Sequence, residues 1–285
     1  MAELSITSYA KINLSLRILR QREDGYHDIE TILQTIDLAD HLNFTALETT
    51  DIQITVSGAD VPTDESNLCF KAAILLREVG GAGKGCRIHI EKKIPLGAGL
   101  GGGSSNAAAT LLALNQLWQL NLSDLQLFEL AKQLGSDVPF FLRSGTALAT
   151  GRGEILNYFE SPWDYYVVVI YPEIQISSGW AYGNYKINLT NSKKDVKLDS
   201  YSLQQIQLHE FVEFFRNDFE SVIFAHYPQL KKIKEELQND AFYASLSGSG
   251  SAIYGLFEHK SDAEKAYYHF RRQYPTFLAK PVLDL

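Results

Sequence analysis

Five glycines stand in the seven positions from 97 to 103, inside the segment PLGAGLGGGSSNAAA. Residues without a Cβ atom favour tight turns and let other groups approach the backbone closely. The segment that follows, SSNAAATLLALNQLW, consists mostly of good helix formers with apolar side chains on all sides. The sequence therefore predicts a glycine loop that opens onto a buried helix in the middle of the chain.

This loop has the properties of a phosphate site. The N-terminus of a helix carries unpaired amide groups and a partial positive charge, and glycines let them approach phosphate oxygens. Ser104 and Ser105 add hydroxyl groups at the helix start. The pattern G-x-x-x-x-G-K-[ST] has Gly103 at its lysine position, so a cation for the phosphates has to come from elsewhere. The alternative is a flexible helix start whose glycines serve only turns.

The same segment, GAGLGG, also satisfies the dinucleotide pattern G-x-G-x-x-G. That pattern belongs in the first turn of a βαβ unit, with an acidic residue about 20 positions later at a strand end. Here the loop lies in the middle of the chain, and Asp124 near that offset falls in a helix cap. An NAD-dependent oxidoreductase is therefore the weakest candidate.

Composition excludes several classes of protein. A length of 285 residues with 45% hydrophobic content is enough for one large domain or two intimate ones. A net charge of −8 and a pI near 5.4 argue against a general binder of nucleic acids or acidic membranes. No signal peptide or membrane-spanning run is evident, so we expect a soluble cytoplasmic protein. Cys69 and Cys86 are expected to be buried thiols rather than a disulfide or a zinc site.

Alternation of apolar residues from Ile12 to Ile18 predicts a half-buried strand whose polar face carries Lys11 and Asn13. Further strands are predicted in the segments IETILQTI, HLNFTAL, DIQITVSG, GCRIHIEKKI, GTALATG, YYVVVIY, FYASL, AIYGLF and FLAKPVL. Between IETILQTI and FYASL, the helical segments and the polar stretch at 185–201 interrupt the strands. That stretch lacks periodicity, which indicates a surface insertion or a domain boundary.

Helices are predicted at six places, two of them with capping boxes. They begin at Asn67, after the glycine loop, after Ser123 with Gln126, near 202 to run to about 225, at Pro228 to run to Leu237, and after Ser261 with Glu264. Strands cluster early, and the chain ends in a strand-helix-strand unit. This order predicts an α+β fold with two lobes that meet at the glycine loop.

The loop PLGAGLGGGSSNAA resembles the ATP-binding motif of the GHMP kinase superfamily. SYAKINLSL at 8–16 and SLSGSGSAIYGLF at 245–257 resemble two further motifs of that superfamily, in the expected order. The segments REDGYHDIETILQTIDLAD and LGSDVPFFL are similar to members whose substrate carries a cytidine diphosphate. The resemblance implies an α+β, two-lobed GHMP kinase fold with the active site in the cleft between lobes. Residues 1–155 would form the ATP-binding lobe and residues 156–285 the C-terminal lobe.

The implied reaction moves the γ-phosphoryl group of ATP to a substrate hydroxyl, which requires positioning, a proton acceptor and positive charge. Lys11 and Asp137 resemble the catalytic pair of the family. Asp137 would orient and deprotonate the hydroxyl, while Lys11 would stabilise phosphate charge and keep Asp137 ionised. Taken singly, Lys11 is also consistent with a solvated strand lysine, and Asp137 with a helix cap ahead of Pro139.

The implied cofactors are ATP and Mg²⁺. The resemblance assigns the phosphate cradle to Pro95, Leu96, Gly97, Ala98, Gly99, Leu100, Gly101, Gly102, Gly103, Ser104 and Ser105. Asn67 and Lys92 fall where the family places its adenine pocket, although a helix cap and a surface lysine explain them equally well. The sequence names no metal ligand.

The implied partner is a small molecule linked to cytidine diphosphate, with no nucleic acid and no membrane; the oligomeric state is not given. Tyr26 and His27 resemble the family's cytosine reader, although the segment is also typical of an exposed hairpin tip. Tyr182 falls near a second stacking aromatic, and Trp180 competes for that assignment. The remaining substrate contacts would come from Asn13, Gly248 and Ser249.

The leading function is therefore phosphorylation of the 2-hydroxyl of a cytidine-diphosphate-linked methylerythritol, in isoprenoid precursor synthesis. A sister kinase for homoserine or mevalonate is the second candidate, and the segment DGYH argues against it because such substrates have no base to stack. A nucleotide-binding module without catalysis is the third. The joint presence of Lys11 and Asp137 counts against that module.

Overall fold

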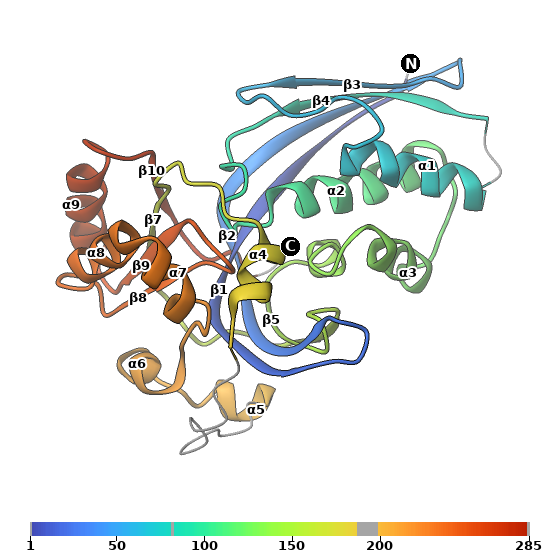
Figure 1. Ribbon diagram of the computed structural model, residues 1–285. Coiled ribbons are helices and arrows are strands. Elements are labelled where there is room, and N and C mark those ends of the chain that lie inside the picture. Colours follow the sequence, from blue (N-terminus) through green and yellow to red (C-terminus); the bar gives the residue numbers. More distant parts are fainter. Residues whose placement is uncertain (1, 81–82, 187–198, 284–285) are drawn as a thin grey trace. The chain divides into compact units, whose positions relative to one another are not determined.

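The structure is a computed structural model that describes residues 2–80, 83–186 and 199–283 (Figure 1). Backbone contacts divide the chain into two compact units. The first unit comprises Met1–Ala10, Leu38–Leu96 and Gly101–Arg143, and the second comprises Lys11–Asp37, Gly97–Leu100 and Ser144–Leu285. Each unit is thus assembled from separated stretches of chain. The sequence-based lobe boundary at residue 155 stays a prediction.

The first unit combines a sheet with a group of helices. Its strands are β3 (Ile52–Ser57), β4 (Gly85–Glu91), the last part of β2 (His27–Leu47) and the start of β1 (Glu3–Gln21). β4 pairs with β3 in parallel and with β2 antiparallel, with His41 opposite Glu91. The helices are α1 (Leu68–Gly80), α2 (Gly102–Leu117), α3 (Asp124–Leu134) and the 3-10 helix η1 (Pro139–Leu142). Figure 1 shows α1, α2 and α3 side by side, and they contact one another.

Local sequence signals of the first unit are confirmed. α2 is buried along most of its length, and its buried residues include Ala107, Ala108 and Leu111. The capping box of α3 is present: the Ser123 hydroxyl accepts from Gln126 N at 3.4 Å, and Gln126 Oε1 accepts from Ser123 N at 2.9 Å. Cys69 and Cys86 are free and buried, and burial raises their thiol pKa values to about 11 and about 12.

The second unit is built on an antiparallel sheet in the order β10-β7-β9-β8. Its strands are β7 (Tyr166–Ile170), β8 (Tyr243–Leu246), β9 (Ile253–Phe257) and β10 (Thr276–Ala279). α8 (Pro228–Leu237) packs on β8 and β9, while α9 (Lys260–Phe270) packs on β7 and β10 (Figure 1). The first part of β2 pairs with β5 (Thr146–Thr150), which pairs with β6 (Ile155–Tyr158).

These elements confirm the α+β prediction: β3 and β4 pair in parallel, whereas the pairs β2–β4, β2–β5, β5–β6, β7–β9, β7–β10 and β8–β9 are antiparallel. IETILQTI and HLNFTAL, predicted as two strands, form the continuous strand β2. The short helix α4 (Ser178–Asn184) and the strand β6 carry no signal that we recognised. Of the predicted insertion at 185–201, residues 187–198 lie outside the described residues. No helix in the described ranges is long and apolar enough to cross a membrane.

The prediction of a half-buried first strand is wrong, because β1 is buried on both faces from Lys11 to Ile18. The polar side chains in this part of β1 bind other residues of the second unit. Arg17, for example, pairs with Glu30 at 3.3 Å and donates to Phe214 O at 2.9 Å. Two carbonyl groups of β1 also accept hydrogen bonds from tyrosine hydroxyls. Tyr243 donates to Leu14 O at 3.0 Å, and Tyr254 donates to Asn13 O at 2.8 Å. Polar side chains of β1 that the alternation predicted to face solvent thus form hydrogen bonds with other buried groups.

The prediction of a long helix from 202 to 225 is also wrong. The segment forms α5 (Ser200–Leu203), η3 (Leu208–Glu210), α6 (Phe211–Phe214) and α7 (Glu220–His226). Between α6 and α7 the chain is extended and bonds to β1: Leu16 N donates to Arg216 O at 2.8 Å, and Asp218 N donates to Leu16 O at 2.9 Å. Pairing with a distant strand therefore overrides local helix preference.

The predicted cap of the last helix is wrong as well. α9 begins at Lys260 with His259 at its N-cap and no side-chain cap bond, so Ser261 lies inside the first turn. This gives a matched pair of serines for a test. Ser123→Ala should lower the free energy of unfolding by about 1 kcal/mol, because it removes a real cap. Ser261→Ala should change it by less than about 0.5 kcal/mol. Urea unfolding followed by circular dichroism measures both, and equal losses would contradict the assignment of the caps.

Candidate functional site

The first half of the glycine loop, Gly97–Leu100, lies in the second unit. Gly97 and Gly99 have φ values of 63° and 78°, a left-handed backbone that side chains disfavour. Lys11 N donates to Leu100 O at 2.9 Å, and Ser247 Oγ donates to Gly99 O at 3.0 Å. A Cβ atom on Gly99 would clash with the carbonyl oxygen of Ser247. The segment Gly97–Leu100 thus packs against the second glycine turn, residues 247–251.

Lys11 is buried against this loop, with only 3% of its surface exposed. Its Nζ donates to Asn13 Oδ1 at 2.6 Å and to Gly99 O at 2.9 Å. A Cβ atom on Gly248 would lie 3.5 Å from Lys11 Nζ and 3.4 Å from Asn13 Oδ1. The structure thus brings together Lys11, Asn13 and both glycine turns, and it excludes a solvated strand lysine.

Asn13 has a fixed orientation in this group. Its Nδ2 donates to Thr31 Oγ1 at 2.9 Å, and that hydroxyl donates to Ser15 O at 2.6 Å. The carbonyl end of the Asn13 side chain therefore faces Lys11 Nζ. Its proposed contact with substrate stays a prediction.

The second glycine turn is held by Asn217, which sequence reasoning missed. The buried Asn217 side chain donates from Nδ2 to Leu246 O and Gly248 O, each at 2.8 Å. Its Oδ1 accepts from Phe219 N at 3.0 Å. No sequence signal marked this residue, since it lies in the segment expected to be helical and its partners are backbone groups. In the same turn, the hydroxyl of Ser249 lies 3.0 Å from that of Ser178.

Aromatic side chains gather elsewhere in the second unit. The rings of His27 and Tyr182 are stacked, with centroids 5.0 Å apart and planes at 19°. Trp180 instead packs edge-on against His226 and Tyr227. Of the two competing aromatics, the structure therefore brings Tyr182 to His27. Burial lowers the pKa of His27 below its usual 6.5, which favours the neutral ring at pH 7.

Tyr26 lies at an exposed hairpin tip, as the alternative explanation supposed, with 55% of its surface exposed. Asp24 Oδ1 accepts from Tyr26 N at 3.1 Å and shapes the turn. The guanidinium of Arg152 lies 4.8 Å from the centroid of the Tyr26 ring, a cation–π contact. Arg152 was not predicted. It supports one face of the aromatic ring at this tip.

The second half of the loop and the start of α2 belong to the first unit. α2 begins at Gly102, after Gly101 with φ 72°, so the helix starts two residues before Ser104. Ser104 is half-buried. The buried Ser105 hydroxyl accepts from Ser8 Oγ at 2.7 Å. Pro95 and Leu96, the first two residues of the loop at 95–105, are half-buried.

Asn67 and Lys92 both have structural partners in the first unit. Asn67 Oδ1 accepts from Cys69 N at 2.9 Å at the start of α1, as a helix cap does. Lys92 is only 6% exposed and forms an ion pair with Asp40, so it is not a surface lysine. Their proposed place in an adenine pocket stays a prediction.

Asp137 is half-buried in the turn between α3 and η1. Val138, rather than Asp137, is the N-cap residue of η1, and η1 has no side-chain cap bond. The structure therefore gives no support to the helix-cap explanation of Asp137.

Residues 2–80, 83–186 and 199–283 contain no group of three or more His, Cys, Asp or Glu side chains that could hold a metal ion. A magnesium ion bound to nucleotide phosphates needs only one or two protein oxygens. The Asp137 carboxylate and the Ser104 hydroxyl are oxygen donors of that kind. A place for Mg²⁺ beside the nucleotide stays a prediction.

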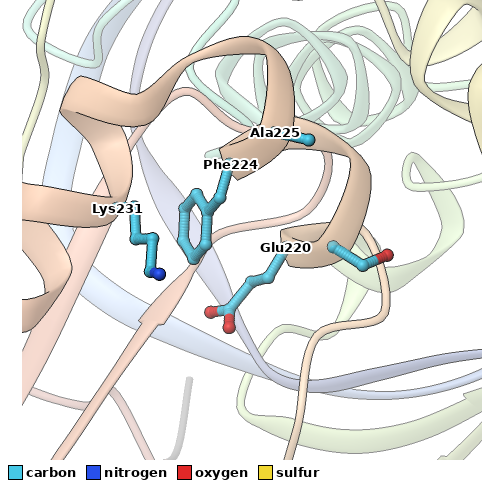
Figure 2. A pocket seen from close by; sticks show the side chains of 5 residues that line it. Glu220, Phe224, Ala225 and Lys231 are labelled. Atoms are coloured by element: carbon cyan, nitrogen blue, oxygen red, sulfur yellow. The ribbon is translucent and has the colours of Figure 1, made fainter.

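A surface depression of about 420 Å³ lies in the second unit and contains none of the predicted residues. It is lined by Glu220, Ser221, Phe224, Ala225 and Lys231 of α7 and α8 (Figure 2). The Glu220 carboxylate accepts from Lys234 Nζ at 2.6 Å and from Ser245 Oγ at 3.0 Å. These bonds give Glu220 a structural role between α7, α8 and β8.

Two family models match the chain. The N-terminal domain of GHMP kinases matches residues 67–145, and the C-terminal domain of GHMP kinases matches residues 202–276. A 4-diphosphocytidyl-2-C-methyl-D-erythritol kinase of Chlorobium phaeobacteroides (strain BS1) is 44% identical over 287 residues, covering 100% of both chains.

Solved structures are similar over nearly the whole length. The crystal structure of a 4-(cytidine 5'-diphospho)-2C-methyl-D-erythritol kinase aligns with a TM-score of 0.82 and 32% identity, covering 98% of this chain and 99% of the other. Homoserine kinase from Cytophaga hutchinsonii aligns with a TM-score of 0.75 at 18% identity, covering 99% and 95%. The second likeness concerns the fold alone.

The left-handed glycine at 99 gives a test of the loop geometry. Gly99→Ala should lower the free energy of unfolding by about 2 to 5 kcal/mol, since the added methyl group meets a fixed carbonyl and the backbone angle is disfavoured. Gly103→Ala is the matched control: it lies in α2, and its Cβ atom would meet only Leu68 Cδ1 at 3.9 Å. It should be neutral or stabilising by up to about 1 kcal/mol. Equal losses in urea unfolding would contradict the described loop.

Proposed function

Since the chain belongs to the GHMP kinase family, we propose that it phosphorylates the 2-hydroxyl of 4-diphosphocytidyl-2-C-methyl-D-erythritol with ATP, in the non-mevalonate route to isoprenoid precursors. The stacked rings of His27 and Tyr182 are the main structural support for this substrate over those of other family members. A cytosine base can use such aromatic faces, whereas homoserine and mevalonate have no base. The relatives at 44% and 32% identity support the same choice.

The phosphates of ATP are assigned to the loop Pro95–Ser105. Gly97, Gly99 and Gly101 each have a left-handed backbone, a conformation that occurs in backbone loops whose amides bind anions. The N-terminus of α2 adds unpaired amides and the positive end of the helix dipole. The family models on either side of residue 155 support the division into lobes 1–155 and 156–285.

The chemistry is assigned to Lys11 and Asp137. The substrate oxygen attacks the γ-phosphorus, its proton passes to the Asp137 carboxylate, and the bond to the β-phosphate oxygen breaks to release ADP. Lys11 contributes positive charge that stabilises the phosphoryl oxygens, and Asn13 and Gly99 O hold its ammonium in place. Mg²⁺, when bound, supplies further charge neutralisation on the nucleotide phosphates.

Base recognition is assigned to the aromatic group of the second unit. A neutral imidazole offers one donor and one acceptor, which suits the mixed edge of cytosine. The lowered pKa of His27 supports this form at pH 7. Tyr26, backed by Arg152 on one face, and Tyr182 supply aromatic surfaces for stacking. Asn13, Gly248 and Ser249 complete the proposed substrate contacts.

The reaction is tested by ADP release with Mg²⁺ and ATP on three substrates: the cytidyl-diphosphate methylerythritol, mevalonate and homoserine. We expect turnover on the cytidyl substrate alone. Asp137→Asn should lower kcat by about a hundredfold or more, because the proton acceptor is lost while the shape of the side chain is kept. Turnover on mevalonate or homoserine would refute the substrate assignment. An active Asp137→Asn enzyme would refute the role of Asp137.

Tyr182 and Trp180 offer a matched pair for the base site. Tyr182→Leu should raise KM for the cytidyl substrate about tenfold with little change in KM for ATP, because a base–aromatic stack contributes about 1 to 3 kcal/mol. Trp180→Leu should change KM for the cytidyl substrate less, since Trp180 packs on His226 and Tyr227. Steady-state kinetics of both variants measure this. A larger effect at Trp180 would reverse the assignment.

A further inference from the structure

One fully buried carboxylate, Asp40 in β2, accepts four hydrogen bonds. Its Oδ1 accepts from Lys93 N at 2.7 Å and Ile94 N at 2.9 Å. Its Oδ2 accepts from Asn106 Nδ2 at 2.9 Å and from Lys92 Nζ, with which it forms an ion pair. No local sequence pattern marks Asp40.

The four donors lie on both sides of the glycine loop. Lys92, Lys93 and Ile94 come directly before the loop at 95–105, and Asn106 comes directly after it. A single carboxylate therefore ties together the chain that enters the loop and the helix that leaves it. Both ends of the loop are fixed from one point in the first unit.

Gly102, in the second half of the loop, packs against two of the residues that bind Asp40. A Cβ atom on Gly102 would lie 2.9 Å from Ile94 Cγ2 and 3.2 Å from Lys92 Nζ. Lys92 Nζ also donates to Asn106 Oδ1 at 3.1 Å, and Asn106 Nδ2 donates to Ser8 Oγ at 2.9 Å. The first turn of α2 is thus set by buried polar contacts rather than by loose apolar packing.

Only an acceptor-only group satisfies this arrangement. All four partners of Asp40 are donors, and an ionised carboxylate offers about four acceptor sites. An asparagine would turn its NH₂ group toward two of those donors. Removal of the negative charge would also leave the buried Lys92 ammonium without its counter-ion, which is costly.

We infer that Asp40 is a positioning residue for the nucleotide: it fixes the spacing between the loop and the start of α2, and so the direction of the amides that bind phosphate. This inference rests on the proposed assignment of Pro95–Ser105 to the phosphates of ATP. Asp40 acts through the loop and carries no role in recognition of the second substrate. Its loss weakens nucleotide binding selectively.

The test compares Asp40→Asn with Asp37→Asn. Asp37 lies on the same strand, is exposed, and accepts from Lys280 N at 2.7 Å, away from the loop. For each variant, calorimetry gives Kd for a non-hydrolysable ATP analogue with Mg²⁺, kinetics give KM for both substrates, and circular dichroism monitors folding. Asp40→Asn should raise Kd for the analogue and KM for ATP about tenfold or more, with KM for the cytidyl substrate within about twofold. Asp37→Asn should leave all three within about twofold.

Unchanged nucleotide affinity in folded Asp40→Asn protein would overturn the inference, as would an equal rise of both KM values. If Asp40→Asn does not fold, Asn106→Ala decides: it removes the bonds of Asn106 to Asp40, Lys92 and Ser8, and it keeps the ion pair between Lys92 and Asp40. It should raise Kd for the analogue severalfold, and an unchanged Kd would overturn the inference.

The proposed function can fail separately from this inference. If the wild type binds the ATP analogue but does not phosphorylate the cytidyl substrate, the substrate assignment is wrong. The ratio of nucleotide Kd values between Asp40→Asn and Asp37→Asn still decides the role of Asp40.

Discussion

The burial of ammonium groups beside the glycine loop is the constraint on which the rest of the structure depends. Lys11 and Lys92 are both removed from water, and a buried cation is costly unless oxygen atoms replace its hydration. Lys11 meets the carbonyl of Gly99, so its burial requires the loop in its left-handed form. Lys92 meets Asp40, which also holds the residues on either side of the loop. In each unit, the groups that bind the buried ammonium therefore also belong to the loop or hold the residues beside it.

Signals that act over a few residues were readable from the sequence. The capping box at Ser123 and the buried helix after the glycine loop depend on neighbours in the chain, and both are as predicted. The burial of both faces of β1 was not readable, because the partners of Arg17 include a carbonyl 197 residues away. Asp40 and Asn217 were missed for the same reason: the donors to Asp40 lie 52 to 66 positions away, and Asn217 donates to carbonyls 29 and 31 positions away. The roles of Lys11, Asp137, Tyr26 and His27 came from family resemblance rather than from any local pattern.

The fold alone does not select the substrate. Homoserine kinase shares the fold at 18% identity, while the relative at 44% identity covers the whole chain. In the proposed function, selection of the substrate is assigned to a few side chains of the second unit. His27 contacts Tyr182 and Tyr26 contacts Arg152, so the side chains proposed for this role come from segments more than 100 residues apart in sequence.

The hydrogen bonds that the hydroxyls of Tyr243 and Tyr254 donate to β1 have a consequence for synthesis of the protein. These residues follow their carbonyl partners on Leu14 and Asn13 by 229 and 241 positions. At ribosomal speeds, the amino-terminal strand waits roughly ten to fifty seconds before these partners are made. During that time its apolar side chains and unpaired edges are open to other chains. The second unit therefore completes its folding only after Tyr243 and Tyr254 have been translated.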